Sequence, residues 1–398
     1  MNNWFKEKAH LNGNPFTPSG TGLPDQNALY ISDKLKAATE KFFSVLSTGT
    51  GAKTFPLIGS YGSGKTAFMK GFLTEFFWKK KIKAFYIENP GVNFYDIANR
   101  VLQSIGRYEF SKALFEISSP YLRIQKTLLG SDYDTFLQSL KNKVDRDNKI
   151  GELQKILLDK GKVNLCDNES VAYSFAKMVI ETKIKPYLDY RDFVSDGRNP
   201  SVPKDMEAKY FNALITAINR IYGTDGVAFL LDEFEDLTLG ARISQHVRLE
   251  YLATFRRLID ESENQNLWIV LAMVPGVEAI ISKLNPPLWQ RFSHHEKKTL
   301  RLEELEQDEI GGMIIKWLDT MRTDDKYRKK FFPFKDDIGR LFTLKTQFRM
   351  PRVIVKTCFN ALAKASQDDQ EPPLEATFVR GVMEEFYPQE RDIEDKNR

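Results

Sequence analysis

The sequence predicts an α/β fold with a parallel sheet, and three observations support this class. The run Gly59–Thr66 matches the pattern G-x-x-x-x-G-K-[ST] and lies between a strand-like and a helix-like segment. A continuous apolar run, Val227–Leu231, ends in two acidic residues, and a second apolar run spans Leu267–Ala272. Apolar runs of this length are typical of strands that are buried on both faces, as in parallel sheets covered by helices.

The chain begins with a segment rich in Gly, Pro and Asn, and residues 1–30 are expected to be extended. Apolar residues then recur at helical spacing over residues 32–47, where Ser32 is placed to cap a helix. The apolar run at residues 55–58 predicts a strand. Pro56 should shorten that strand, because proline cannot donate a ladder hydrogen bond.

The strand leads into the predicted phosphate-binding loop, which consists of Gly59, Ser60, Tyr61, Gly62, Ser63, Gly64, Lys65 and Thr66. Without side chains at Gly62 and Gly64, successive backbone N–H groups can point at phosphate oxygens. Lys65 adds a positive charge toward the β- and γ-phosphates, and the Thr66 hydroxyl is placed to ligate Mg²⁺. A helix over residues 67–77 should follow, with its N-terminus at the phosphates. The sequence therefore predicts a nucleoside triphosphate site.

Further elements alternate until a helical stretch interrupts them. A strand is expected at Ala84–Ile87 and a helix at Tyr95–Ile105. Residues 107–204 contain helix-like stretches and no convincing strand, so they are expected to form a helical insertion. A polar loop, Ser195–Pro200, marks its edge, and a periodic helix resumes at Ala208–Ile221.

The apolar run Val227–Leu231 delivers Asp232 and Glu233 to its carboxyl end, which is a Walker B pattern. Ligands bind at this edge of open α/β sheets. We expect Asp232 to hold the metal through water and Glu233 to polarise the water that attacks the γ-phosphate. The next apolar run, Leu267–Ala272, predicts a strand between this one and the strand before the loop, as in the additional-strand class of P-loop enzymes.

The order of these motifs resembles that of AAA+ ATPases over roughly residues 12–105 and 205–365. Within them it resembles the branch of origin-recognition initiators, transposition regulators and ATPases of phage-defence systems such as BREX. The resemblance implies an ATP- and Mg²⁺-dependent core over 31–106 and 205–305 and a helical lid over 306–388. A flexible tail over 389–398 completes the expected organisation.

Two arginines acquire roles from the resemblance. Arg291 precedes the strand-like run Thr299–Leu302, where the family places an arginine finger that reaches the neighbouring subunit's nucleotide. A guanidinium offers several fixed donors to a phosphoryl group, although a salt bridge within its own subunit is the alternative. Arg352, which follows a proline at the start of a helix-like run, matches the family's sensor 2, and Arg349 is the second choice.

The chain departs from the family pattern in three respects. The fourth strand ends in Ala272-Met273-Val274 where relatives carry a polar sensor 1 residue, so hydrolysis is expected to be slow. After the lid too few residues remain for the winged-helix domain that initiators carry. The insertion 107–204 also has no counterpart that can be aligned.

Two functions follow from these residues. The first is an ATP-hydrolysing, homo-oligomeric switch that acts on DNA or a DNA-bound partner, within phage defence or a mobile-element system as the resemblance implies. The alternative is a weakly hydrolysing, ATP-bound scaffold that recruits a nuclease or transposase through the insertion. A metabolic kinase is disfavoured, because two acidic residues after the strand suit hydrolysis better than transfer to a small acceptor.

Composition limits the other classes. The 398 residues are 42% hydrophobic, and no apolar run approaches the roughly 20 residues that span a bilayer. No membrane association and a cytoplasmic location are expected, since neither a secretory signal nor a disulfide framework is evident. Adjacent His294 and His295 do not suggest a metal site. A net charge of +4 permits contact with nucleic acid, and the lysine-rich run 79–83 is either a solvated helix end or a DNA-backbone contact.

Overall fold

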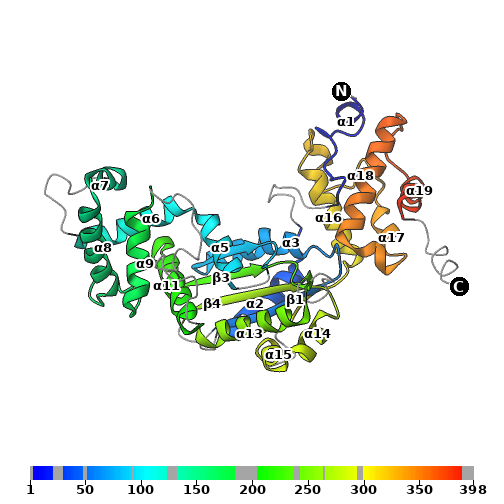
Figure 1. Cartoon of the computed structure of the whole chain (residues 1–398). Coiled ribbons are helices and arrows are strands. Elements are labelled where there is room, and N and C mark those ends of the chain that lie inside the picture. Colours follow the sequence, from blue (N-terminus) through cyan, green and yellow to red (C-terminus); the bar gives the residue numbers. More distant parts are fainter. Residues whose placement is uncertain are drawn as a thin grey trace. The chain divides into compact units, whose positions relative to one another are not determined.

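A computed structural model of the chain describes residues 3–20, 30–47, 52–91, 94–122, 132–183, 204–236, 243–262, 265–293 and 299–387. Figure 1 shows its helices and strands. The internal contacts divide the chain into two compact units. Unit 1 comprises Met1–Lys41, Leu57–Leu73 and Leu300–Arg398, and unit 2 comprises Phe42–Pro56 and Thr74–Thr299. Within the described ranges, no helix combines the length and the apolar character that crossing a membrane requires.

One five-stranded sheet carries the fold, with the strand order β2-β3-β4-β1-β5. Its strands are β1 (Lys53–Gly59), β2 (Ile82–Ile87), β3 (Gly226–Leu231), β4 (Leu267–Met273) and β5 (Leu300–Leu302). The β1–β5, β2–β3 and β3–β4 pairs are parallel. The predicted α/β class with a parallel sheet is therefore confirmed, as is an extra strand, β4, between β3 and β1.

The buried runs explain where the central strands form. Every residue of β3 and β4 is buried, as expected for apolar runs covered on both faces. The expectation that Pro56 shortens β1 is wrong, because β1 runs through this residue for seven residues. The pairing of β1 with β5 begins at Leu57, so the ladder on that side does not require an N–H group from Pro56.

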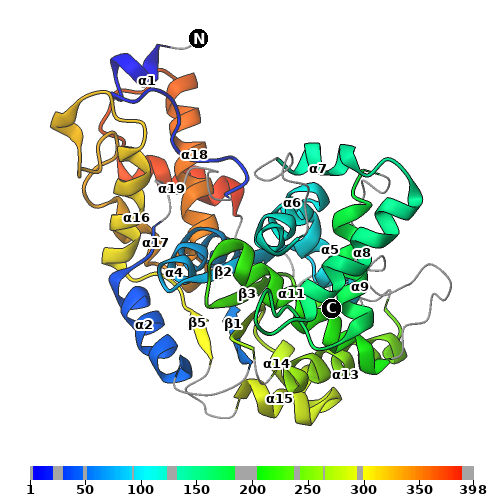
Figure 2. The same ribbon diagram turned by 90° about the vertical axis from the view of Figure 1, so that its left-hand side faces the viewer.

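Helices of unit 2 include those of the predicted insertion, and Figure 2 shows them from a second side. They are α5 (Phe94–Ile105), α6 (Arg107–Ser118), α7 (Tyr133–Ser139), α8 (Lys143–Leu158), α9 (Glu169–Ile180), α11 (Lys204–Tyr222), α13 (Gln245–Glu261), α14 (Val277–Leu284) and α15 (Pro286–Ser293). Side-chain caps fix several of their starts: Asp132, Asn142 and Asn168 each accept a hydrogen bond from the backbone three residues on. The tail of the insertion, 184–203, lies outside the described residues.

The remaining helices begin with α1 (Trp4–Glu7) and α2 (Asp33–Ser47). Ser32 caps α2 as predicted, since its hydroxyl accepts a hydrogen bond from the Leu35 N–H at 3.2 Å. After the phosphate-binding loop the helix is built from α3 (Lys65–Ala67), a π-helical segment (Phe68–Leu73) and α4 (Thr74–Lys79). The C-terminal helices are α16 (Gln307–Asp319), α17 (Ile338–Phe342), α18 (Pro351–Gln367) and α19 (Ala376–Phe386).

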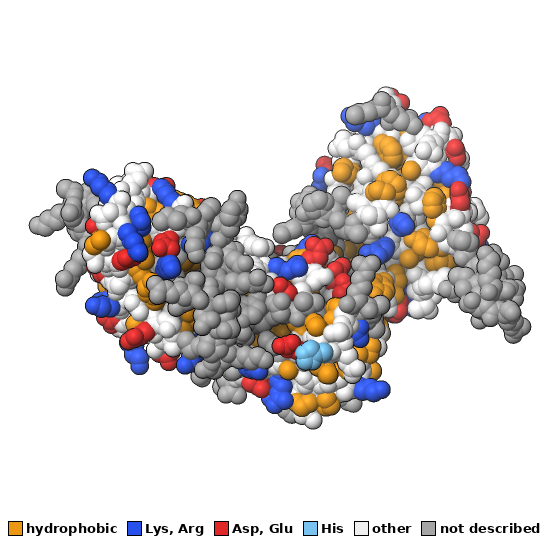
Figure 3. Space-filling model, in the orientation of Figure 1, with side chains coloured by type: hydrophobic (Ala, Val, Ile, Leu, Met, Phe, Trp, Pro, Cys, Tyr) orange, Lys and Arg blue, Asp and Glu red, His pale blue; other side chains and the backbone are white. Residues whose placement is uncertain are grey.

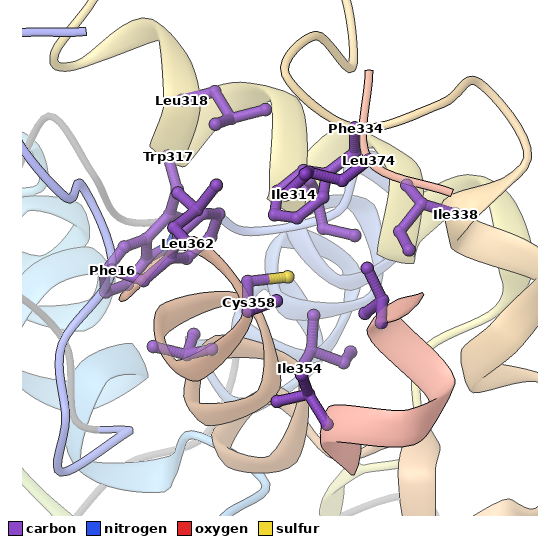
Figure 4. Close-up of a cluster of buried hydrophobic side chains, with 14 of the residues drawn as sticks. Phe16, Ile314, Trp317, Leu318, Phe334, Ile338, Ile354, Cys358, Leu362 and Leu374 are labelled. Atoms are coloured by element: carbon purple, nitrogen blue, oxygen red, sulfur yellow. The ribbon is translucent and has the colours of Figure 1, made fainter. Parts of the chain in front are cut away.

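Unit 1 has a hydrophobic core that the C-terminal helices share with the N-terminal segment (Figure 4). Trp4, Leu11 and Phe16 are buried in it together with residues of α16 and α18. The Phe16 ring is stacked on Trp317 with centroids 5.6 Å apart. Residues of the segment 3–20 thus contribute to the core of unit 1. The composition of this segment did not indicate such burial.

Candidate functional site

The phosphate-binding loop occupies the turn between β1 and α3, within unit 1. Gly62 and Gly64 have φ values of +82° and +93°, a conformation that glycine adopts without the strain of other residues. The Ser63 N–H donates to the Ser60 carbonyl at 3.1 Å and closes the turn. The loop therefore has the backbone shape that the glycine pattern predicts.

Lys65 is the charged group of the loop and is buried. Its Nζ donates to the Gly59 carbonyl at 2.7 Å, and it lies 5.7 Å from the centre of the Tyr61 ring. The Ser63 hydroxyl is also buried and has no hydrogen-bond partner among the described residues. A buried cation and a buried hydroxyl in one glycine loop fit a phosphate group, and the exposed Thr66 carries the hydroxyl that would ligate Mg²⁺.

The predicted acidic pair lies at the carboxyl end of β3, within unit 2. Asp232 is buried, and its carboxylate accepts hydrogen bonds from the Tyr86 hydroxyl at 2.8 Å and from the Glu233 N–H at 3.0 Å. Its own N–H donates to the Ile87 carbonyl at 2.9 Å, so the residue is fixed on the backbone of β2. Asp232 is thus held in one orientation by three contacts.

Glu233 differs from Asp232 in exposure and backbone. It is exposed and has φ = +54°, which is uncommon for a residue with a side chain and is often found at functional sites. Although the residue as a whole is exposed, partial desolvation of its carboxyl raises the pKa of this group. The nearby carboxylates raise the pKa further; they belong to Asp236, Asp232, Glu88 and Glu235. A carboxylate with a raised pKa is a better proton acceptor than an ordinary glutamate.

Arg291, on α15, makes an ion pair inside its own chain. Its Nε donates to Asp260 Oδ1, and its Nη2 donates to Asp260 Oδ2 at 2.9 Å. Nη1 donates to the Pro287 carbonyl at 2.7 Å. Asp260 lies on α13 and also faces Arg256 at 3.5 Å. The contact corresponds to the alternative that the sequence left open, and the role in a neighbouring subunit stays a prediction.

Arg352 and Arg349 have different surroundings within unit 1. Arg352 lies at the start of α18, where its N–H donates to the Gly62 carbonyl of the phosphate-binding loop at 3.2 Å. No hydrogen bond or ion pair of its exposed guanidinium is found among the described residues. Arg349 instead donates to the Leu305 carbonyl at 2.8 Å and pairs with Glu306 at 2.8 Å, at the start of α16. Of the two arginines, Arg352 is the one in contact with the loop.

Several residues at these places were not singled out from the sequence. Tyr86 and Glu88 lie at the carboxyl end of β2, beside the acidic pair on β3, because Ile87 pairs with Leu231. The position of Glu88 directly after an apolar run was a usable signal. Asp260 gave no signal, since it lies 31 residues before Arg291 on another helix.

At the carboxyl end of β4 the residues Ala272, Met273 and Val274 are buried and apolar. The Ala272 carbonyl accepts a hydrogen bond from the Phe234 N–H at 3.2 Å, directly after the acidic pair. The stretch Ala272–Val274, which carries no polar side chain, therefore lies beside the turn that contains Asp232 and Glu233.

Comparison with known proteins gives similarity to solved structures. The Aeropyrum pernix ORC2 protein in its ADPNP-ADP complexes is 13% identical, with 88% of this chain and 67% of that chain covered and a TM-score of 0.44. Its ADP form is 11% identical, with 91% and 73% covered and a TM-score of 0.43. Cdc6p from Pyrobaculum aerophilum is 14% identical, with 87% and 67% covered and a TM-score of 0.41.

These similarities concern the fold alone. No protein-family model matches the sequence, and no curated protein matches it either. The α/β class therefore depends on the strand pairings of this chain, and the function must be argued from its own residues.

Proposed function

We propose that the protein binds and hydrolyses ATP and acts as a nucleotide-dependent, homo-oligomeric AAA+ switch on DNA or a DNA-bound partner. The observation that carries the proposal is the phosphate-binding loop. In it the glycines have positive φ values, the Lys65 ammonium is buried, and the buried Ser63 hydroxyl has no hydrogen-bond partner within the described part of the chain. These are the features that a loop needs in order to wrap a polyphosphate.

The roles of the residues follow from their chemistry. Gly59, Ser60, Tyr61, Gly62, Ser63 and Gly64 supply the loop, and Lys65 places a positive charge on the β- and γ-phosphates. Thr66 and Asp232 would hold Mg²⁺, which supplies charge neutralisation of the phosphates when bound. Glu233 accepts the proton of the attacking water. Arg352 contacts the terminal phosphate, and Arg291 of a neighbouring subunit completes the site.

Calorimetry tests the nucleotide site directly. Titration of Mg·ATP into the wild-type chain should give a saturable heat signal, and Lys65→Ala should abolish it, because a buried cation that faces phosphate is lost. Lys79→Ala is a matched control, since Lys79 is an exposed lysine on α4 whose partner is Glu75. An absence of heat with the wild-type chain would sink the proposal.

A second function, an ATP-bound scaffold that recruits an effector nuclease or transposase through the insertion, is favoured by one observation. The stretch Ala272–Val274 beside the acidic turn is apolar and offers no side chain to place the attacking water. Glu233→Gln separates the two functions. In a hydrolysing switch this variant should retain ATP binding and lose ATP turnover by about 10²-fold or more. In a scaffold it should still recruit the effector nuclease or transposase.

Salt dependence tests the DNA role. Binding to duplex DNA through phosphate contacts should weaken steeply as salt rises, and DNA should stimulate the ATPase. Charges of both signs are interspersed over the face drawn in Figure 3, and the net charge of the chain is only +4. Attraction of DNA by the overall charge is therefore weak, and binding would require a local group of lysines and arginines. An ATPase indifferent to DNA at low salt would remove this part of the proposal. A role in phage defence or a mobile-element system is the most specific part and rests on the resemblance of the motifs.

A further inference from the structure

The stem of Arg352 is approached closely by two glycine backbones in unit 1. A Cβ atom at Gly62 would lie 2.9 Å from Arg352 Cβ, and one at Gly20 would lie 2.7 Å from both Arg352 Cγ and the Arg352 carbonyl oxygen. Carbon atoms in ordinary contact are about 3.5–4.0 Å apart. Neither glycine can therefore be replaced unless the arginine shifts. One glycine belongs to the phosphate-binding loop, and the other belongs to the N-terminal segment.

Gly20 itself is held in place. Its φ is +67°, and its N–H donates to the Thr17 carbonyl at 3.1 Å, which closes a turn. Just before this turn, Phe16 is buried against Trp317. Asn14 donates from its side chain to the carbonyl of Phe359, which lies on the same helix as Arg352, at 2.9 Å. The N-terminal segment is thus anchored on α16 and on α18, the helix that carries the arginine, and these contacts oppose its movement away from a larger residue at position 20.

We propose that Gly20 is a positioning residue that holds the Arg352 stem against the phosphate-binding loop and thereby sets the ability of the site to distinguish ATP from ADP. The inference rests on the proposed role of Arg352 at the terminal phosphate. An arginine side chain has many rotamers, and confining its stem lowers the entropy that is lost when its guanidinium binds. With the stem confined by its close approach to Gly20 and Gly62, only the far end of the side chain remains to be ordered.

The test measures dissociation constants for a non-hydrolysable ATP analogue and for ADP by calorimetry, on the full chain. Arg352→Ala should reduce the preference for the ATP analogue about tenfold, because one charge-assisted contact to phosphate is lost. Gly20→Ala and Gly20→Asn should reduce it in the same direction with the ADP constant unchanged. In the Arg352→Ala background, Gly20→Ala should not change the preference further, since the guanidinium that it would displace is gone and only the contact with the backbone carbonyl of residue 352 remains.

Two controls separate positioning from backbone strain. Gly223 has φ = +61°, close to that of Gly20, and nothing lies within 4 Å of a Cβ placed there. Gly223→Ala therefore introduces the same strain without a collision and should keep the preference of the wild type. Asparagine tolerates positive φ better than alanine, so Gly20→Asn keeps the collision and reduces the strain. Thermal midpoints of all variants confirm that each is folded at the temperature of titration.

The outcomes distinguish this inference from the proposed function. If Arg352→Ala loses the preference and Gly20→Asn keeps it, the positioning role of Gly20 is overturned and the proposed role of Arg352 stands. If Arg352→Ala keeps the preference, both are overturned. A loss in Gly223→Ala equal to that in Gly20→Ala would assign the effect to strain and would also overturn the positioning role.

Discussion

At the scale of single residues, Arg291 has an observed contact and a proposed role that exclude each other. Its guanidinium is engaged by the carboxylate of Asp260 through two nitrogens and by the Pro287 carbonyl through the third. An arginine finger must leave such contacts to reach a phosphate in the next subunit. Both side chains of the ion pair are about one third exposed, so water can replace the lost contacts at modest cost, about 0–1 kcal/mol. The ion pair with Asp260 is therefore compatible with an arginine finger that leaves Asp260 when a neighbouring subunit presents its nucleotide.

Two substitutions at this pair should differ in their effect on turnover. Arg291→Ala removes the donor to the phosphoryl group and should lower kcat by about 10³-fold or more with the affinity for ATP little changed. Asp260→Asn releases the guanidinium but keeps it present, so kcat should stay close to that of the wild type. Steady-state ATPase assays at high protein concentration provide the measurement. Equal losses in both variants would show that the ion pair stabilises the subunit and that Arg291 acts on nothing else.

What could be predicted at this scale depended on local pattern. The loop Gly59–Thr66 and the pair Asp232 and Glu233 are contiguous in sequence, so their spacing alone indicated their chemistry. The contact between Gly20 and Arg352 joins residues more than 300 positions apart in the chain. No periodicity connects such residues, because only the tertiary fold brings them together.

At the scale of elements, the N-terminal segment shows what composition does not reveal. Glycine, proline and asparagine favour turns, which is why residues 1–30 were expected to be extended. Three large apolar side chains within it, Trp4, Leu11 and Phe16, nevertheless enter the core of unit 1. Burial of each such side chain is favourable by about 1.5–3 kcal/mol, which outweighs weak local preferences. The strands β3 and β4 were predictable, in contrast, because burial on both faces leaves a continuous apolar run.

The stability of unit 1 should therefore depend on this segment. Phe16 is 3% exposed and stacked on Trp317, so Phe16→Ala should lower the free energy of unfolding by about 3–5 kcal/mol through lost burial and a residual cavity. Phe386→Ala, at a phenylalanine of the same unit that is 52% exposed, should change it by about 0.5 kcal/mol or less. Urea unfolding followed by tryptophan fluorescence measures both. Similar losses in the two variants would mean that the segment does not support the core.

At the scale of the whole molecule, the strand order relates motifs that are far apart in the chain. The loop follows β1 and the acidic pair follows β3, and β4 lies between these strands in the sheet. Parallel strands place their carboxyl ends at one edge, which is why motifs 166 residues apart, at Thr66 and Asp232, can be proposed to serve one metal ion. The strand order could be predicted in part, because two apolar runs followed the loop. The grouping of the loop with the C-terminal helices could not, since it depends on contacts such as Arg352 N–H to the Gly62 carbonyl.

If Arg291 of one subunit completes the nucleotide site of its neighbour, as proposed, then assembly of the subunits depends on bound nucleotide. A ligand that binds only the assembled form stabilises it by RT ln(1 + [L]/Kd), which is about 2.7 kcal/mol at one hundred times the dissociation constant. The mass of the wild-type chain, measured by light scattering, should therefore rise when a non-hydrolysable ATP analogue is added. Under the proposed function, Lys65→Ala removes the charge that holds the nucleotide and Arg291→Ala removes the bridge to it. Both variants should therefore remain at the mass of the nucleotide-free chain. Assembly of Arg291→Ala at the analogue concentration that assembles the wild type would show that this arginine does not join the subunits, and the search for the bridging residue would then move to other exposed arginines.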